Sequence, residues 1–169
     1  PDAPWTWHNS DELAGSGPLG DLGSHSIDLA HYLVGDIDAV SGQLKTFVDE
    51  RTPVDSDEPR PVTVDDAFTA EVAFENGAIG TFEASRFATG HKNDQTIEIH
   101  GTKGSIRFEL ERLNELQVLR EGNRGYETIM ITDDEDPYIK HWFQLAGLVL
   151  GWEHSVVHEN FEFLTTIED

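Results

Sequence analysis

Cysteine is absent from the 169-residue sequence, and basic residues are scarce. Without cysteine the protein has no disulfide, no thiolate metal ligand and no cysteine nucleophile. Eleven Lys and Arg stand against 33 Asp and Glu, so the formal net charge is −22. A field of that sign repels nucleic-acid phosphates and anionic lipid headgroups. We therefore expect no nucleic-acid partner and no membrane partner.

Long apolar segments are lacking as well. The best run, residues 142–150, is about nine residues long, whereas a membrane-spanning helix needs roughly 20. The N-terminal residues have neither the basic start nor the apolar middle of a secretory signal, and the chain opens on Pro1 without an initiator Met. These features predict a cytoplasmic domain excised from a longer gene product.

The acidic side chains are spread along the whole sequence rather than gathered in one tail. Concentrated salt screens the mutual repulsion of such carboxylates. The Phe, Trp and Tyr content is too high for a disordered acidic chain. The composition therefore predicts a folded protein from a salt-adapted organism, and an ordinary acidic protein with solvated faces is the alternative.

Hydrophobic periodicity predicts a helix, a series of strands and a second helix. Apolar residues recur with helical spacing over 21–33, Gly35 follows as a C-cap, and residues 152–167 are helical again. Strands are predicted by alternation over 40–48, 68–74, 78–87, 96–100, 105–111, 116–119 and 126–132. Asn76-Gly77 marks a hairpin. The pattern predicts an α+β fold, a mostly antiparallel open β-sheet with helices packed on one face, in a single domain over 1–169.

Gly15, Gly17 and Gly20 match the G-x-G-x-x-G pattern of dinucleotide-binding loops, and Asp36 lies near the distance of a ribose-binding acid. Such a loop follows a buried strand, whereas residues 7–14 are polar. The later strands belong to hairpins rather than to βαβ units. We therefore interpret the glycines as a flexible entry to a helix, and we expect no cofactor site in this chain.

Asp21 and His25 are four residues apart, so on an α-helix they share one face. Imidazole has an ordinary pKa of about 6.5, which suits proton removal from an alcohol when a carboxylate orients the ring. On spacing alone, a capping Asp and a core or surface His are the more ordinary explanation of the pair.

Residues 17–29, which contain Asp21, Gly23, His25 and Asp28, resemble the Asp-x-Gly-x-His-x-x-Asp signature of one enzyme family. The signature opens the C-terminal domain of the glucose-fructose oxidoreductase and inositol dehydrogenase family, called Gfo/Idh/MocA. The similarity continues through residues 64–68, 74–86 and 99–106. The resemblance implies a two-domain dehydrogenase whose N-terminal Rossmann domain, absent here, binds NAD or NADP and contributes a catalytic Lys. This chain is then the substrate-binding and oligomerisation domain, inactive by itself.

The same resemblance implies roles for particular residues. His25 takes the proton from a sugar or cyclitol hydroxyl, and Asp21 orients either His25 or the substrate. Further substrate contacts are expected from Arg86, Lys92, Asn93 and Trp7. No metal ligand is expected. A homodimer or homotetramer is expected through the open sheet face, where the side chains are Thr69, Glu71, Arg107 and Glu109.

Two other functions remain open at the level of the sequence. The chain could be a sugar-binding or interaction module without catalysis. It could also be a metal-dependent isomerase or hydrolase that uses Asp21, His25 and Asp28. The upstream gene sequence separates the dehydrogenase from the module, and metal analysis tests the third function.

Overall fold

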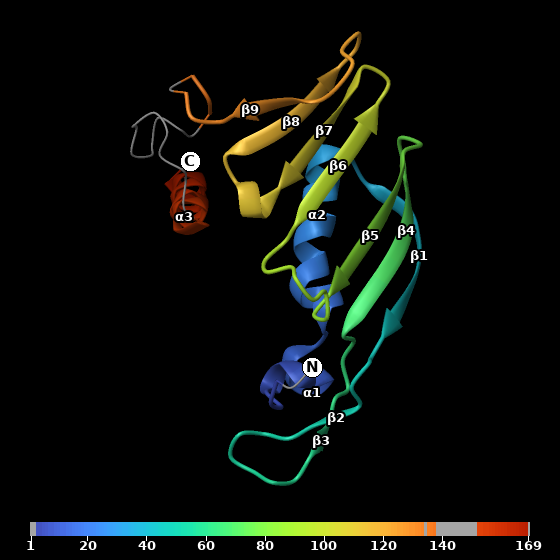
Figure 1. Ribbon diagram of the computed structural model, residues 1–169. Coiled ribbons are helices and arrows are strands. Elements are labelled where there is room, and N and C mark those ends of the chain that lie inside the picture. Colours follow the sequence, from blue (N-terminus) through green and yellow to red (C-terminus); the bar gives the residue numbers. More distant parts are fainter. Residues whose placement is uncertain (1–2, 134, 138–151, 169) are drawn as a thin grey trace. The chain divides into compact units, whose positions relative to one another are not determined.

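The computed structural model describes residues 3–133, 135–137 and 152–168. The chain divides into two compact units, Pro1–Gly90 and His91–Asp169, and antiparallel strands dominate both (Figure 1). Within the described ranges, no helix is both long enough and apolar enough to cross a bilayer.

The first unit opens with two short helical turns. The 3₁₀ turn η1 spans Trp7–Asn9 and α1 spans Asp11–Ala14. Asn9 is buried, and its side chain accepts the backbone N–H of Thr6 at 2.8 Å. The N–H of Asp11 donates to the hydroxyl of Thr63 at 2.9 Å. Because Thr63 lies far along the chain, local patterning could not reveal this support.

The predicted helix over 21–33 is present, but its first part is wound differently. A π-helical turn, η2, spans Leu19–Gly23, and α2 spans Ser24–Leu33. In a π-helix each N–H bonds the carbonyl five residues back instead of four. Asp21 therefore lies in the π-helical turn, and His25 lies in the first turn of α2. The predicted stop is confirmed, since Gly35 follows the C-cap Val34 with φ +134°.

The main sheet of the first unit has the order β1-β4-β5 and is antiparallel. The strands are β1 (Ile37–Lys45), β4 (Ala67–Phe74) and β5 (Ile79–Ser85). The hairpin at Asn76-Gly77 is confirmed, because Gly77 turns between β4 and β5 with φ +87°. One face of β4 is buried through Phe68, Val72 and Phe74, and Val62 and Val64, which precede the strand, complete the buried hydrophobic core of the described residues.

A short two-stranded ladder lies within the acidic loop between β1 and β4. It pairs β2 (Glu50–Arg51) with β3 (Arg60–Pro61). The N–H of Val62 donates to the carbonyl of Asp49 at 2.8 Å, which extends the ladder toward β4. The loop therefore returns the chain to the core at Val62.

The second unit contains a four-stranded antiparallel ladder in sequence order. It comprises β6 (Thr96–Gly101), β7 (Gly104–Glu109), β8 (Glu115–Arg120) and β9 (Glu127–Met130). The 3₁₀ turn η3 (Leu110–Arg112) joins β7 to β8. Ile97, Phe108 and Leu116 lie side by side on one half-buried face. The predicted last helix is confirmed as α3 (Trp152–Glu168), although the apolar side chains Val157, Phe163 and Ile167 are exposed.

Candidate functional site

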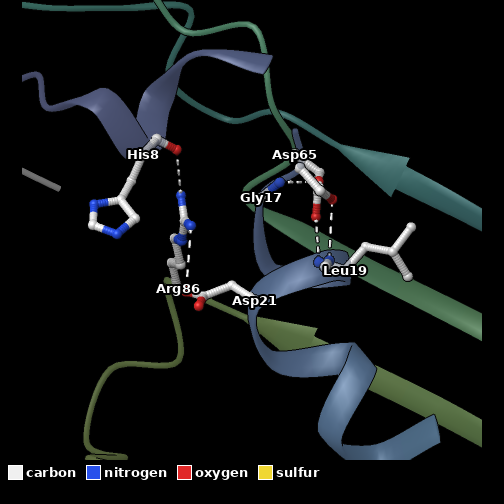
Figure 2. Close-up of polar contacts among 8 residues, drawn as sticks. His8, Gly17, Leu19, Asp21, Asp65 and Arg86 are labelled. Atoms are coloured by element: carbon white, nitrogen blue, oxygen red, sulfur yellow. Dashed lines mark hydrogen bonds and ion pairs between the residues drawn. The ribbon is translucent and has the colours of Figure 1, made fainter. Parts of the chain in front are cut away.

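The buried carboxylate of Asp65 holds the beginning of η2 (Figure 2). The N–H of Gly17 donates to Oδ1 and the N–H of Leu19 donates to Oδ2, each at 2.9 Å. The Ser16 hydroxyl lies 3.4 Å from Oδ1. The first amides of a helical segment have no partner within the helix, and negative charge is favoured there. Asp65, from a distant part of the sequence, supplies both the hydrogen-bond acceptors and the negative charge.

Close packing at Gly17 and Gly20 and the backbone conformation of Gly15 explain the three glycines of the G-x-G-x-x-G match. A Cβ on Gly17 would lie 1.9 Å from the backbone oxygen of Asp65, and one on Gly20 would lie 2.7 Å from Cβ of Ser16. Gly15 has φ +79°, a conformation that favours glycine. The amides that would bind a pyrophosphate in a dinucleotide loop are engaged by Asp65. These residues therefore do not fit a nicotinamide dinucleotide.

Asp66, next to Asp65, points its carboxylate at a different part of the first unit. Its Oδ2 accepts the N–H groups of Phe47 and Val48 at 2.8 and 3.2 Å, just after β1. Its backbone carbonyl accepts the N–H of Arg86 at 3.0 Å. The dipeptide therefore ties together η2, the end of β1 and the end of β5. In the sequence these aspartates are visible only as part of a family motif, because their hydrogen-bond partners lie far away along the chain.

Arg86 follows β5 and reaches two elements of the N-terminal segment. Its Nη1 donates to the carbonyl of His8 at 3.3 Å, and its Nη2 lies 3.6 Å from Oδ2 of Asp21 (Figure 2). The ring of His8 stacks on Trp7 with centroids 3.6 Å apart, and Trp7 is 54 % exposed. The structure thus groups Arg86 with Asp21 and, through His8, with the turn that carries Trp7.

His25 lies on the first turn of α2, and its side chain is exposed. Among the residues that the structure describes, no hydrogen bond or ion pair joins His25 to Asp21, whose ionic partner is Arg86. Asp28, the third residue of the metal alternative, is also exposed. Within residues 3–133, 135–137 and 152–168, no group of three or more His, Asp or Glu side chains is arranged to hold a metal ion.

Lys92 and Asn93 belong to the second unit, in the segment before β6. Their backbone N–H groups both donate to Oε1 of Glu111 at 3.1 Å, and their side chains are exposed. Beside them, His91 contacts the Asp94 carboxylate. The hydroxyl of Thr96 and then the imidazole of His91 lower the pKa of Asp94. The candidate residues that polar contacts bring together, Arg86, Asp21 and the turn of Trp7, therefore all lie in the first unit.

A family model described as the GFO/IDH/MocA C-terminal domain matches residues 1–107. The chain belongs to the Gfo/Idh/MocA family. The resemblance inferred from the motifs is thereby confirmed. A curated member of the Gfo/Idh/MocA family, levoglucosan dehydrogenase from Pseudarthrobacter phenanthrenivorans, is 38% identical over 186 residues, which cover 100% of this chain and 47% of that protein.

Two solved structures extend the comparison within the Gfo/Idh/MocA family. An oxidoreductase domain protein from Kribbella flavida is 40% identical with TM-score 0.92, and the match covers 99% of this chain and 46% of that one. Levoglucosan dehydrogenase in complex with NADH and levoglucosan is 38% identical with TM-score 0.89, and the match covers 98% of this chain and 45% of that one. The predicted α+β fold is confirmed. The chain spans about half the length of the relatives it matches.

Proposed function

We propose that this chain is the substrate-binding half of an NAD(P)-dependent sugar or polyol dehydrogenase. The observation that carries the proposal is the arrangement at the start of α2, where an exposed imidazole, His25, follows a carboxylate, Asp21, that is paired with Arg86. The arrangement lies in the segment that carries the family signature. Related proteins solved with NADH and levoglucosan or L-sorbose support the substrate class.

His25 is the proton acceptor in this proposal. Imidazole titrates near neutral pH, so its neutral form accepts a proton from an alcohol. Removal of that proton makes the adjacent carbon a better hydride donor, and the bound nicotinamide supplies the hydride acceptor. Because Asp21 contacts Arg86 rather than His25, we assign Asp21 to orienting the sugar.

Substrate binding is assigned to Arg86 and Trp7 of the first unit and to two residues of the second unit. Guanidinium has five N–H donors in a rigid fork, so Arg86 can contact Asp21, His8 and a sugar hydroxyl together. The exposed face of Trp7 suits the apolar face of a sugar ring. From the second unit, the exposed side chains of Lys92 and Asn93 are further candidates.

The cofactor is assigned to a part of the protein outside this chain. The glycine loop here offers no place for a pyrophosphate because Asp65 occupies its amides. We therefore propose that NAD or NADP binds mainly to a nucleotide-binding domain that also supplies a catalytic Lys. This chain alone should be inactive and should bind neither nucleotide.

Oligomerisation and cellular location are part of the same proposal. Thr69 and Glu71 are exposed on the face of β4 opposite the core, where Glu71 lies between Ser41 and Thr81. On β7, Arg107 is exposed and Glu109 is half-buried. We propose a homodimer or homotetramer through polar strand faces such as these, in the cytoplasm of a salt-adapted organism. Light scattering in molar KCl tests the assembly, and a monodisperse monomer would count against it.

A substrate screen tests the proposed activity. The protein that contains this chain together with its nucleotide-binding domain is mixed with NAD or NADP and with levoglucosan, L-sorbose or a cyclitol. We expect reduction of one nucleotide, followed by its absorbance, with at least one of these compounds. Binding of a sugar without any nucleotide reduction would instead identify a non-catalytic module.

A further inference from the structure

We propose that Asp65 is a positioning residue that sets where Asp21 and His25 lie. The inference rests on the proposed function, since it assigns His25 as the proton acceptor. Asp65 precedes β4 and lies far in sequence from the segment that it holds. Its effect on catalysis would be exerted through η2 and α2.

The two oxygens of Asp65 hold two different amides. Oδ1 accepts from Gly17 and Oδ2 accepts from Leu19, and the side chain is nearly enclosed, with 7% of the residue exposed. Both bonds require an acceptor at each oxygen position. An Asn side chain has one acceptor and one donor, so it would satisfy one amide and oppose the other. The ionised carboxylate is therefore specific to this role.

Close packing fixes the same segment at both of its ends. At the beginning, Gly17 approaches the Asp65 backbone so closely that a Cβ there would meet its carbonyl oxygen at 1.9 Å. At the end, a Cβ on Gly23 would meet the ring of Phe68 at 2.8 Å. Asp65 and Phe68 are three residues apart, so one short stretch of chain determines the position of the whole π-helical turn.

The neighbouring backbone places the partner of Asp21. The carbonyl of Asp66 accepts the N–H of Arg86, whose guanidinium pairs with Asp21. The Asp65 side chain thus holds the segment of Asp21, while the backbone of residue 66, which a change of its side chain leaves in place, holds Arg86. Catalytic groups displaced by about 1 Å can lose on the order of 10²-fold in rate. A carboxylate that anchors the turn therefore has a direct effect on turnover.

Asp66 provides a matched control for Asp65. It is also buried, at 1% exposure, and its carboxylate also accepts two backbone N–H groups, but these belong to Phe47 and Val48. Because both N–H groups share Oδ2 of Asp66, the amide oxygen of Asp66→Asn can keep them, whereas Asp65→Asn must lose one of its two bonds. Asp66→Asn thus controls for the loss of charge at a buried carboxylate. In the protein that contains the nucleotide-binding domain, we expect Asp65→Asn to lower kcat by roughly 10- to 100-fold with an unchanged KM for the nucleotide. Asp66→Asn should keep kcat within about threefold of that of the unmodified protein, even if its melting temperature falls as far as that of Asp65→Asn.

A double-mutant cycle shows whether Asp65 acts through His25. In a His25→Ala background, Asp65→Asn should lower kcat by clearly less than it does in the unmodified protein, because His25 is gone and only the effect through Asp21 remains. A double variant whose loss in kcat equals the product of the two single losses would overturn the proposal. So would equal kcat losses in Asp65→Asn and Asp66→Asn that follow their melting temperatures. Full activity in His25→Ala alone would instead overturn the proposed function.

Two further measurements apply if Asp65→Asn does not fold. Asp65→Glu keeps the charge and both acceptors but lengthens the side chain, so it should lower kcat more than the Asp66→Glu control. In the unmodified protein, the amides of Gly17 and Leu19 should exchange with solvent as slowly as those of β4. Exchange as fast as that of the open residue Gly125 would overturn the proposal by itself.

Discussion

Arg86 and Asp21 meet where β5 ends, with Nη2 of the guanidinium 3.6 Å from Oδ2 of the carboxylate. The Arg86 side chain is 23% exposed and that of Asp21 is 56% exposed. Ion pairs with such access to water contribute less than about 1 kcal/mol to the free energy of unfolding. The importance of the contact therefore lies in where it places the two side chains.

Arg86→Lys distinguishes the role of Arg86 in placing Asp21 and the sugar from its contribution to the free energy of unfolding. Lys keeps the charge but presents a single ammonium group, which cannot hold the His8 carbonyl and Asp21 with the geometry of a guanidinium. We expect KM for the sugar to rise roughly tenfold, the size of one lost charged hydrogen bond, while the free energy of unfolding changes by less than about 1 kcal/mol. Steady-state kinetics and denaturant unfolding measure the two. An unchanged KM and kcat would show that Arg86 has only a structural role.

Gly17→Ala tests the packing explanation of the glycine loop. The new Cβ would overlap the Asp65 carbonyl, so the chain must shift, and overpacking of this kind costs about 1–3 kcal/mol or more. Gly125→Ala is the control, because no atom lies within 4 Å of its Cβ position. Urea unfolding should show a large loss for Gly17→Ala and almost none for Gly125→Ala. Equal stability of the two variants would refute the close approach at Gly17.

The strands of the core could be predicted because their signal is local. Alternation places Phe68, Val72 and Phe74 on one face of β4, and that face is the one that is buried. The same alternation on β1 did not predict burial, since Val40 and Leu44 are 69% and 58% exposed. β1 is an edge strand of its sheet, which a period of two cannot reveal.

The candidate site could be predicted only in part, because its supports come from distant residues. The family signature identifies Asp21 and His25, but it cannot show that Asp65 holds η2 or that Asp21 pairs with Arg86. The π-helical winding of Leu19–Gly23 also follows no local rule of spacing. Lys92 and Asn93 follow Arg86 closely in sequence yet belong to the other compact unit.

Stability should depend on salt concentration. The 33 carboxylates repel one another at low ionic strength, and at 1 M salt the Debye length of about 3 Å removes most of that repulsion. We expect the melting temperature to rise markedly between dilute buffer and molar KCl. Scanning calorimetry over this range provides the measurement. A melting temperature that does not change would exclude the salt-adapted interpretation.

The pKa of Asp11 should report the contact between α1 and Thr63. The Thr63 hydroxyl donates to Oδ1 of Asp11 at 2.7 Å and lowers the pKa of that carboxyl. Because the folded pKa is depressed, the resulting stabilisation is present above the unfolded value of about 3.9 and is lost as the pH falls through the folded value. Thr63→Val should therefore raise the pKa of Asp11, which carboxyl NMR measures.

Asp94 is the internal control for that titration. Its pKa is lowered first by the hydroxyl of Thr96, in the second unit, so Thr63→Val should leave it unchanged. If the pKa of Asp11 also stays the same in Thr63→Val, the hydrogen bond to Thr63 is not the cause of its shift.

The turnover of His25→Ala tests the central claim most directly. Loss of a general base lowers kcat by roughly 10²- to 10⁴-fold, while nucleotide affinity should stay constant because the nucleotide binds to another domain. Asp21→Asn should also slow turnover without unfolding α2. His31→Ala is the matched control, since His31 lies on the same helix and contacts Asp36. We predict that His25→Ala is folded and nearly inactive while His31→Ala keeps its activity; a folded His25→Ala protein with full activity across the pH range would contradict the catalytic assignment.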